Sequence, residues 1–487
     1  MKLDIIGGSY GEPSVNKFST RQCINWIPYV FPPTENNKAQ AVLRNTEGYT
    51  LFSEIDTTLG SSIKSCIEYN DIGYFICNNT FYSVDPVGAV TSIGTITSTV
   101  EKPCLIPGTY IQAASGEASS GYIMICAGQY GYTYDVVTET FAQITHAEFV
   151  GANQGTYQNG RWFVVYNNII YISDTNDPTS WSLLNFVSEG YQAAKFKAAI
   201  SYTDDLYFIS DNLTENYFDT GSATIIEKRD RSTIHYGIAA VNSLLLLNNS
   251  LFWVTRSVSG ELSVIQYSLN EIKVHSAGSI SKTLFQNFDV TDAFAYGYAI
   301  QGHVFYQITF PSLDRTFVFN LDSGIWSEKS SYKKTSGTST RYGRHTGNCH
   351  MYLAHQHIIG DYESGRLYKL DPDVYTEDGE AIIRTFTSKC FAQDLKFSSD
   401  AFLSLDYSCS PTDPNTNSII TLNISKDGGH TYGADRQRDL GLTGDHKKRA
   451  SWKGLGVSRD FVFKFTTSVE GEILIGDATF QGAIGTK

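Results

Sequence analysis

The sequence has few of the features that mark helical or membrane-spanning proteins. Its 487 residues include only 12 Pro and 3 Met, and 18% of residues are charged. No stretch has the length and 3.6-residue period of a long helix. The longest apolar run, four leucines from Leu244, is too short to span a bilayer, and the opening MKLDIIGGSYGEPSVNKF lacks the apolar core of a signal peptide. We therefore expect no membrane anchor and folding in a cytoplasm.

Cysteine pairs and nucleotide-binding motifs are also missing. The eight cysteines are scattered without a CxxC pair, which favours buried free thiols over a disulfide framework. No Walker loop, GxSxG or HExxH motif occurs, so no cofactor is expected. A formal net charge of −13 opposes general attraction to phosphate, which argues against sequence-specific DNA binding.

Aromatic residues and glycine are abundant, with 31 Tyr, 28 Phe and 41 Gly, a composition typical of strands joined by tight turns. One unit recurs: an apolar strand, a polar turn and a second strand with aromatics. The instances include YFICNNTFYSVD from Tyr74, RWFVVYNNIIYISD from Arg161, LLLLNNSLFWVT from Leu244 and HMYLAHQHIIGDYESGRLYKLD from His350. Their spacing of roughly 40 to 60 residues is that of four-stranded propeller blades. We predict an all-β chain with a β-propeller of six or seven blades.

The turns of the repeat carry their own signals. Asn-Asn at the hairpin tip suits positive φ, and the strand that follows often ends in Asp. A large aromatic comes shortly after that Asp, at Phe141, Trp181 and Trp326. We expect the Asp to close its turn by bonding the backbone two residues on, and the aromatic to cover the edge of the next blade.

The pattern changes after about Ile383, where alternating strands continue without a blade-like unit. This change predicts a C-terminal β-sandwich over residues 384–487, following a propeller over 53–383. Residues 1–52 are expected to form an N-terminal arm and first strands that close the propeller.

The segment ISKDGGHTYG, from Ile424, matches the Asp-box turn of sialidases and other propellers. Ser425, Asp427 and Thr431 can satisfy backbone groups, the two glycines supply positive φ, and Tyr432 packs. A glycan-cleaving propeller would also need arginines converging on a carboxylate. Five arginines, however, fall at assorted blade positions and not at one recurring strand end: Arg161, Arg231, Arg256, Arg315 and Arg366. We interpret the motif as a structural turn and predict no catalytic residues.

One histidine-rich segment, RHTGNCHMYLAHQHIIGD, contains His345, Cys349, His350, His355 and His357. If His355 and His357 lay on one strand, they would face the same side and could share a zinc ion. The segment also fits a blade hairpin, and we expect no metal there.

Two basic stretches stand out from the acidic background: the residues from Lys329 to His345, and those from Asp445 onward. We call the second stretch the basic segment. It has four positive charges around Trp452, on Lys447, Lys448, Arg449 and Lys453. Such a patch can be a solvated loop, can attract an acidic partner surface, or can contact nucleic-acid phosphate at short range. Trp452 would be either the aromatic anchor of such a contact or part of the domain core.

Both ends of the chain resemble the packaged-DNA stabilisation proteins, or tail hub proteins, of short-tailed phages. In the segment from Phe18 to Phe52 the likeness lies in Asn25, Pro28, Leu43, Arg44 and Gly48. Near the C-terminus it lies in an Asp-Gly turn, a Tyr-Gly pair and a basic stretch leading to Trp and Gly. These residues are Asp427, Gly428, Tyr432, Gly433, Trp452 and Gly456.

This resemblance implies a structural virion protein without catalytic residues. It implies a homo-oligomeric ring, a hexamer in that family, below the portal and the head-to-tail adaptor. The ring would close the DNA exit channel, stabilise packaged DNA, and dock tailspikes or tail fibres and a tail needle. An acidic wall would let DNA pass without sticking. The alternatives are a glycan-binding or glycan-cleaving, sialidase-like propeller of a receptor-binding tail component, and a zinc-dependent structural module.

Overall fold

The computed structural model consists of strands joined by turns, with a 3-10 turn at Pro311–Leu313. In the part of the chain described here, no helix is long and apolar enough to cross a membrane. The structure describes residues 2–3, 22–31, 41–56, 60–110, 120–188, 195–222, 224–230, 232–256, 262–268, 271–275, 289–334, 340–388, 390–392, 402–412, 418–442, 445 and 448–481.

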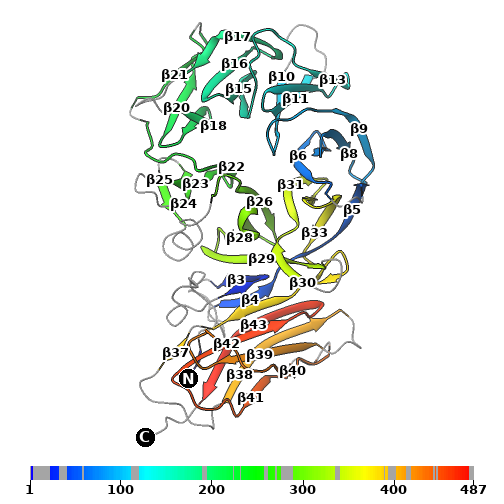
Figure 1. The fold of residues 1–487 in the computed structure, drawn as a ribbon, viewed down its shortest axis with the longest axis vertical. Helices are drawn as coiled ribbons and strands as arrows, with labels where there is room; N and C mark the ends of the chain where they lie inside the picture. Colours follow the sequence, from blue (N-terminus) through cyan, green and yellow to red (C-terminus); the bar gives the residue numbers. More distant parts are fainter. Residues whose placement is uncertain are drawn as a thin grey trace.

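Seven four-stranded antiparallel units surround one axis and form the propeller (Figure 1). The first three blades are β6 (Ile63–Tyr69), β7 (Ile72–Cys77), β8 (Thr80–Val84) and β9 (Val90–Thr95); β10 (Cys104–Tyr110), β11 (Ser120–Ala127), β12 (Tyr130–Asp135) and β13 (Thr140–Gln143); and β14 (Gln154–Gln158), β15 (Arg161–Tyr166), β16 (Ile169–Asp174) and β17 (Asp177–Val187). The next three are β18 (Phe196–Tyr202), β19 (Asp205–Ser210), β20 (Thr214–Asp219) and β21 (Ile226–Lys228); β22 (Ala240–Leu247), β23 (Ser250–Arg256), β24 (Leu262–Ser268) and β25 (Glu271–Val274); and β26 (Phe294–Ile300), β27 (His303–Phe310), β28 (Arg315–Asn320) and β29 (Ile325–Lys334).

The seventh blade combines the two ends of the propeller sequence. It contains β31 (Gly347–Leu353), β32 (Gln356–Asp361) and β33 (Gly365–Asp371), and its outer strand is β5 (Gly48–Asp56). The short strands β34 (Thr376–Glu377) and β35 (Glu380–Ala381) extend this sheet, while β30 (Thr340–Arg344) pairs with β29. The N-terminal part of the chain thus closes the propeller through β5.

Apolar side chains fill the spaces between adjacent blades. The first strands β6, β10, β14, β18, β22, β26 and β31 contact one another around the axis. Between blades one and two, the buried Phe81 ring lies 5.9 Å from that of Tyr134 and packs in one cluster with Ile123. This burial between units explains why single blades are not independent folding units.

The turns follow the sequence prediction with one difference. Asn167 and Asn168 both have positive φ (48° and 67°), and Asp135 accepts a hydrogen bond from Val137 N at 2.9 Å. The aromatic, however, contacts the preceding blade and not the next one. Phe141 in blade two lies 6.0 Å from Phe81 in blade one, because its side chain projects from β13 toward that neighbour.

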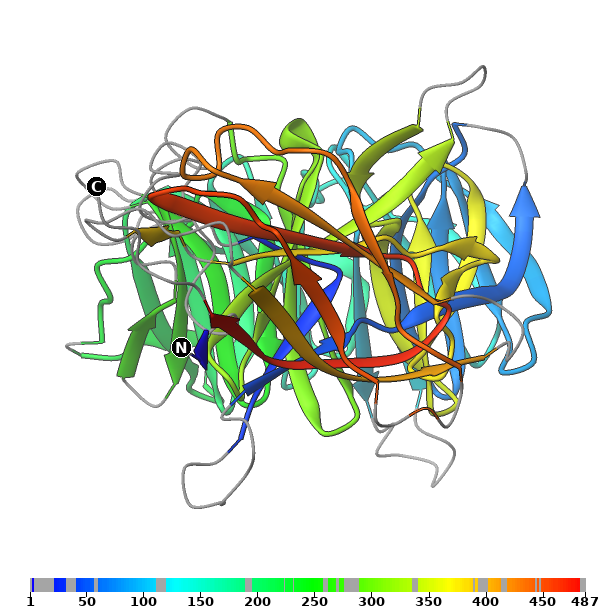
Figure 2. The same cartoon turned by 90° about the horizontal axis from the view of Figure 1, so that it is seen from below.

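The C-terminal domain is a sandwich of two sheets, seen in front of the propeller in Figure 2. One sheet contains β38 (Phe402–Pro411), β41 (Ala450–Lys453) and β43 (Gly471–Gln481). The other contains β36 (Arg384–Thr387), β37 (Phe391–Ala392), β39 (Ile419–Ser425), β40 (Arg436–Asp439) and β42 (Asp460–Thr467). The core between them includes the fully buried Trp452, Leu403 and Phe463. The predicted order, a propeller followed by a sandwich, is confirmed.

The N-terminal strands before β5 lie in the sandwich, although the sequence interpretation placed them in the propeller. β3 (Trp26–Val30) pairs with β4 (Ala41–Asn45), which pairs with β43, as does β1 (Lys2–Leu3). Trp26 is fully buried in the sandwich core, with its ring 5.9 Å from Phe386. The physical reason is that Trp26 and Leu43 bury their side chains against the C-terminal strands.

The two domains also share a sheet. β2 (Cys23–Ile24) pairs in parallel with β29 of blade six and antiparallel with β36 of the sandwich. The hydrogen-bonded order therefore runs without a break from β26 through β29, β2 and β36 to β40. The N-terminal segment joins the two domains by backbone hydrogen bonds.

Candidate functional site

At the junction of the propeller and the sandwich, several buried hydrogen bonds join the two domains, and Asn25 makes four of them. Asn25 Nδ2 donates to Ser330 O at 2.8 Å and to Ile383 O at 2.9 Å, while its Oδ1 accepts from Ser330 N at 2.9 Å. Its own backbone N–H donates to Glu328 O at 2.8 Å. Asn25 is 3% exposed and has φ of 58°, a conformation that Asn tolerates better than most residues. One side chain thus ties together β2, blade six and the connection into the sandwich.

A buried ion pair lies in the same junction. Lys329 Nζ, on β29, contacts the Glu47 carboxylate and donates to Tyr298 Oη at 2.6 Å. Next to Glu47, Gly48 has no room for a side chain, because a Cβ there would lie 2.3 Å from Thr376 O. The close approach of the Thr376 backbone therefore requires glycine at position 48.

Arg384 and Glu377 extend this buried polar group into the first sandwich strand. Arg384 is fully buried, its Nη1 donates to Val469 O at 2.9 Å, and burial lowers its pKa to about 10. Burial raises the pKa of Glu377 to about 7, although Ser331 Oγ donates to its carboxylate at 3.0 Å. The junction therefore contains two ionisable groups whose charged forms are disfavoured by burial.

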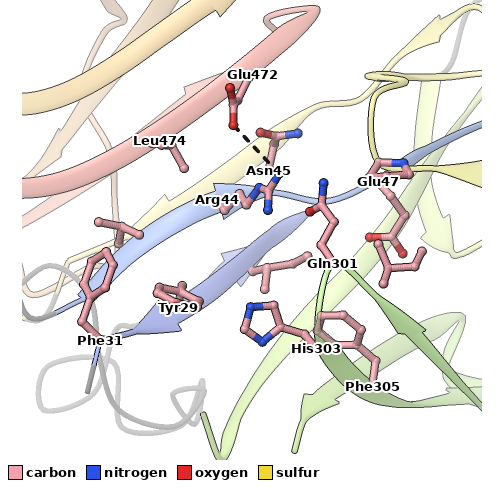
Figure 3. A pocket seen from close by; sticks show the side chains of 14 residues that line it. Tyr29, Phe31, Arg44, Asn45, Glu47, Gln301, His303, Phe305, Glu472 and Leu474 are labelled. Atoms are coloured by element: carbon pink, nitrogen blue, oxygen red, sulfur yellow. Dashed lines mark ion pairs between the residues drawn. The ribbon is translucent and has the colours of Figure 1, made fainter. Parts of the chain in front are cut away.

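A pocket of about 360 Å³ opens between β3, β4, blade six and β43. Figure 3 shows Tyr29 and Phe31 on one side and His303 and Phe305 on the other. The Tyr29 and His303 rings lie 5.1 Å apart, edge to face. Arg44, one of the residues that carry the resemblance, forms an ion pair with Glu472 of β43 at 3.9 Å (Figure 3).

The Asp-box segment is a capped turn after β39, as predicted. Asp427 Oδ1 accepts from Ser425 Oγ at 2.6 Å and from Thr431 N at 2.9 Å, and these hydrogen bonds hold the pKa of Asp427 well below its usual range. Gly428 and Gly429 have φ of 76° and 95°. Tyr432, expected to pack, is 37% exposed. Both oxygens of the Asp427 carboxylate accept hydrogen bonds from within the turn, which supports a structural role for the motif.

The basic segment is split between surface and core. Arg449 and Lys453 are exposed, whereas Lys448 Nζ bonds Asp439 at 2.7 Å; Lys447 lies outside the described residues. Trp452 is fully buried and donates from Nε1 to Arg436 O at 2.9 Å. Of the two alternatives for Trp452, the structure shows the core, because β41 turns this side chain inward against Phe465. The other basic stretch begins at the buried Lys329, and its residues 335–339 lie outside the described residues.

The histidines do not gather around one point. His355 has φ of 63° in the turn between β31 and β32, so it does not share a strand face with His357. His357 Nδ1 lies 3.0 Å from His350 Nε2, and burial lowers the pKa of His350 to about 3. His345 Nδ1 accepts from Gly347 N at 3.1 Å. Among the described residues, no three His, Cys, Asp or Glu side chains are arranged to hold a metal ion.

The arginines weighed for glycan binding are engaged separately. Arg161 donates to Ser173 O at 2.8 Å, Arg315 pairs with Glu328 at 2.7 Å, and Arg366 pairs with Glu54 at 2.9 Å. Arg256 is exposed, and Arg231 lies outside the described residues. Within the described ranges, Arg161, Arg315 and Arg366 each bind a different partner and do not converge on one site for a sialic-acid carboxylate.

Family comparison matches nearly the whole chain. A model described as bacteriophage P22 Gp10, beta-propeller, matches residues 1–375, and a second, bacteriophage P22 Gp10, beta-sandwich, matches residues 387–482. The chain belongs to the bacteriophage P22 Gp10 family. It is therefore a structural protein of a phage tail, and the resemblance found at the chain ends is confirmed. No curated protein matches the sequence significantly.

Solved structures similar to this Gp10-family protein include other β-rich domains. An extracellular domain of a one-component system from B. thetaiotaomicron is 11% identical with a TM-score of 0.41, over 73% of this chain and 46% of that one. The Pan2 WD40 domain of Neurospora crassa is 8% identical with a TM-score of 0.40, over 67% of this chain and 96% of that one. This chain thus spans less than half the length of the B. thetaiotaomicron protein chain.

Sequence reasoning identified Asn25, Arg44 and Gly48 through resemblance, and the structure supplies their contacts. It missed Glu47, Lys329 and Arg384, whose partners lie far away along the chain. Lys329 had been grouped with surface cations, because no local pattern separates a buried lysine from an exposed one.

Proposed function

We propose that this Gp10-family protein is the tail hub: a homo-oligomeric ring, a hexamer by family resemblance, added below the portal and the head-to-tail adaptor. The ring closes the DNA exit channel, stabilises packaged DNA, and docks tailspikes or fibres and a needle. Its place is the virion tail, reached by assembly in the host cytoplasm. Contact with packaged DNA is not sequence-specific, since the chain carries a net charge of −13.

The observation that carries the proposal is the unbroken sheet from blade six into the sandwich, locked by Asn25. A plug held against pressurised DNA needs domains that do not hinge. Inter-domain contacts within a chain ordinarily allow relative motion. Here the shared strand β2 and the buried Glu47–Lys329 pair oppose that motion.

Reconstitution tests the proposal. DNA-filled heads that lack this protein are mixed with the purified chain, and the DNA that becomes accessible to nuclease is measured over time. We expect the complete chain to retain DNA in the heads and to appear as a ring in electron micrographs of the tail. Unchanged leakage, with the protein absent from the particles, would contradict the hub assignment.

A further inference from the structure

One end of the propeller axis opens into a polar mouth of about 760 Å³, lined by segments from six blades and by the connection between blades one and two. Its charged side chains are Lys64, Lys102, Lys197, Arg344, Glu101 and Asp292. Four cations therefore meet two carboxylates, in a chain whose overall charge is −13. The mouth therefore has a net positive charge, whereas the chain as a whole is negative. This local charge acts on ligands within a Debye length of about 8 Å.

Lys102 lies against an aromatic wall of this mouth. Its Nζ donates to Asn348 O at 2.6 Å and to Asn348 Oδ1 at 3.2 Å, and it lies 3.5 Å from the centroid of the Phe294 ring. Burial lowers the pKa of Lys102 to about 8. Its hydrogen-bond partner Asn348 and the Phe294 ring are neutral, and Glu101 of the same mouth acts on its charge electrostatically without forming an ion pair in the described structure.

Arg344 also lies against an aromatic ring, and carboxylates in its surroundings, Asp314 first among them, act on its charge electrostatically. Its guanidinium carbon lies 3.7 Å from the centroid of the Tyr362 ring. Among the described residues, neither Arg344 nor Lys102 forms an ion pair with a carboxylate. The mouth's own Asp292 is engaged by Ser312, whose N–H donates to it at 2.7 Å, and Lys197 is paired with Asp211 at 3.8 Å.

The remaining polar lining indicates the chemistry of the ligand. Asparagines from several blades face the mouth: Asn153, Asn167, Asn168, Asn242 and Asn348. An amide side chain both donates and accepts, which matches the peptide group of an extended segment. The rings of Phe294 and Tyr362 are covered by the two cations, which leaves these faces unavailable for stacking against a sugar.

We propose that the mouth binds an acidic peptide segment of a partner protein. A Glu or Asp carboxylate of that segment lies between Lys102 and Arg344, and the asparagine amides bond its backbone. Arginine recognises a carboxylate through two parallel hydrogen bonds, which gives this contact both energy and direction. This site lies apart from the basic segment of the sandwich and goes beyond the hub function.

The test uses the full chain and a fluorescein-labelled hexaglutamate peptide, with hexaglutamine as the uncharged reference, followed by fluorescence anisotropy. We expect hexaglutamate to bind at least about tenfold more tightly than hexaglutamine, and Arg344→Gln and Lys102→Met each to weaken it at least about tenfold. Lys273→Gln removes an equal charge from the exposed outer strand β25 and should leave affinity unchanged. Melting curves identify any variant that does not fold, and either mouth variant alone can carry the test.

Three results would overturn the proposal. The first is equal loss of affinity in Lys273→Gln, which would show general attraction to cations. The second is unchanged binding in the folded mouth variants. The third is displacement of the peptide by millimolar glucuronate or inorganic phosphate at constant ionic strength, which would assign the mouth to an acidic sugar or a simple anion.

Discussion

Glu47 and Lys329 form a buried ion pair across 282 residues of sequence, with side chains 1% and 4% exposed. Glu47 belongs to the segment that leaves the sandwich sheet for blade seven, and Lys329 to the outer strand of blade six. Two charges are removed from water to make this contact, so each depends on the other. The pair connects the N-terminal segment to the propeller only when both partners are present.

Replacing only one residue of the Glu47–Lys329 pair should therefore lower the free energy of unfolding. Lys329→Met leaves the Glu47 carboxylate buried without its cation, and we expect the free energy of unfolding to fall by about 3–5 kcal/mol. Urea denaturation followed by tryptophan fluorescence measures the change. The double variant Glu47→Leu/Lys329→Met should recover most of the loss, and Lys273→Met, in an exposed pair, should change little. A double variant no more stable than the single one would contradict the ion-pair explanation.

Asn25→Ala should loosen the two domains from each other. It removes the hydrogen bonds to Ser330 and Ile383, leaves buried groups unpaired at about 1–3 kcal/mol each, and places Ala at φ of 58°. We expect calorimetry to resolve separate melting of propeller and sandwich where the parent melts in one transition. Asn423→Ala serves as the control, because it removes an exposed hydrogen bond between the side chains of Asn423 and Asp435. A single melting transition in Asn25→Ala, unchanged from the parent, would show that the pairing of β2 is sufficient to make the two domains unfold together.

Glu377 makes stability depend on pH. Its pKa in the folded chain, about 7, lies above the unperturbed value of 4.5, so the folded state keeps a proton that the unfolded state has lost. Raising the pH from 4.5 to 7 therefore destabilises the fold through this group. Glu377→Gln does not ionise, so its stability relative to the parent should rise across that range and stay level above it. Urea midpoints of both proteins at about pH 5 and about pH 8 measure this difference.

Removing metal ions with a chelator should leave the melting temperature of the protein unchanged. The contacts of His350 with His357, and of His345 with Gly347, account for these side chains without an ion. A structural zinc would contribute on the order of 10 kcal/mol to folding, so its removal would be obvious. We expect the same melting curve with and without chelator. Stoichiometric zinc in the purified protein, with a lower melting temperature in chelator, would contradict this.

The exposed part of the basic segment should matter for assembly and not for folding. Arg449→Glu/Lys453→Glu leaves the Lys448–Asp439 pair intact, and exposed substitutions usually change stability by less than about 0.5 kcal/mol. We expect a normally melting variant that fails to join tails and leaves particles that leak DNA. Lys273→Glu/Lys369→Glu changes the net charge equally on the propeller. Equal assembly by both double variants would place the docking surface elsewhere.

The blades could be predicted from sequence because each one repeats a local pattern. Turn residues such as Asn167 and Asp135 act within a few positions, so their geometry follows from their own chemistry. The number of blades, left between six and seven, depended on β5, which pairs with β33 some 300 residues away along the chain. No local signal reports such a pairing.

The sites were harder to predict for the same reason. Lys102 and Arg344 come from different blades and become neighbours only when the ring closes. The sequence does not decide whether Trp452 lies at the surface or in the core. Side chains of a strand alternate between its two faces, and the sequence alone does not show which face is covered. Resemblance correctly selected Asn25, but its bonds to Ser330 and Ile383 required the folded chain.

The pairing of β5 with β33, and of β4 with β43, has a consequence for the order of folding. The strands β4 and β5 leave the ribosome long before they can pair, because β43 and β33 are synthesised several hundred residues later. Until then Trp26 and the edge of blade seven stay uncovered, and exposed strand edges invite pairing with other chains. Before β33 and β43 have been made, the chain therefore has neither a closed propeller nor a complete sandwich. Only a chain that contains all four strands can present the finished surface to an assembling particle.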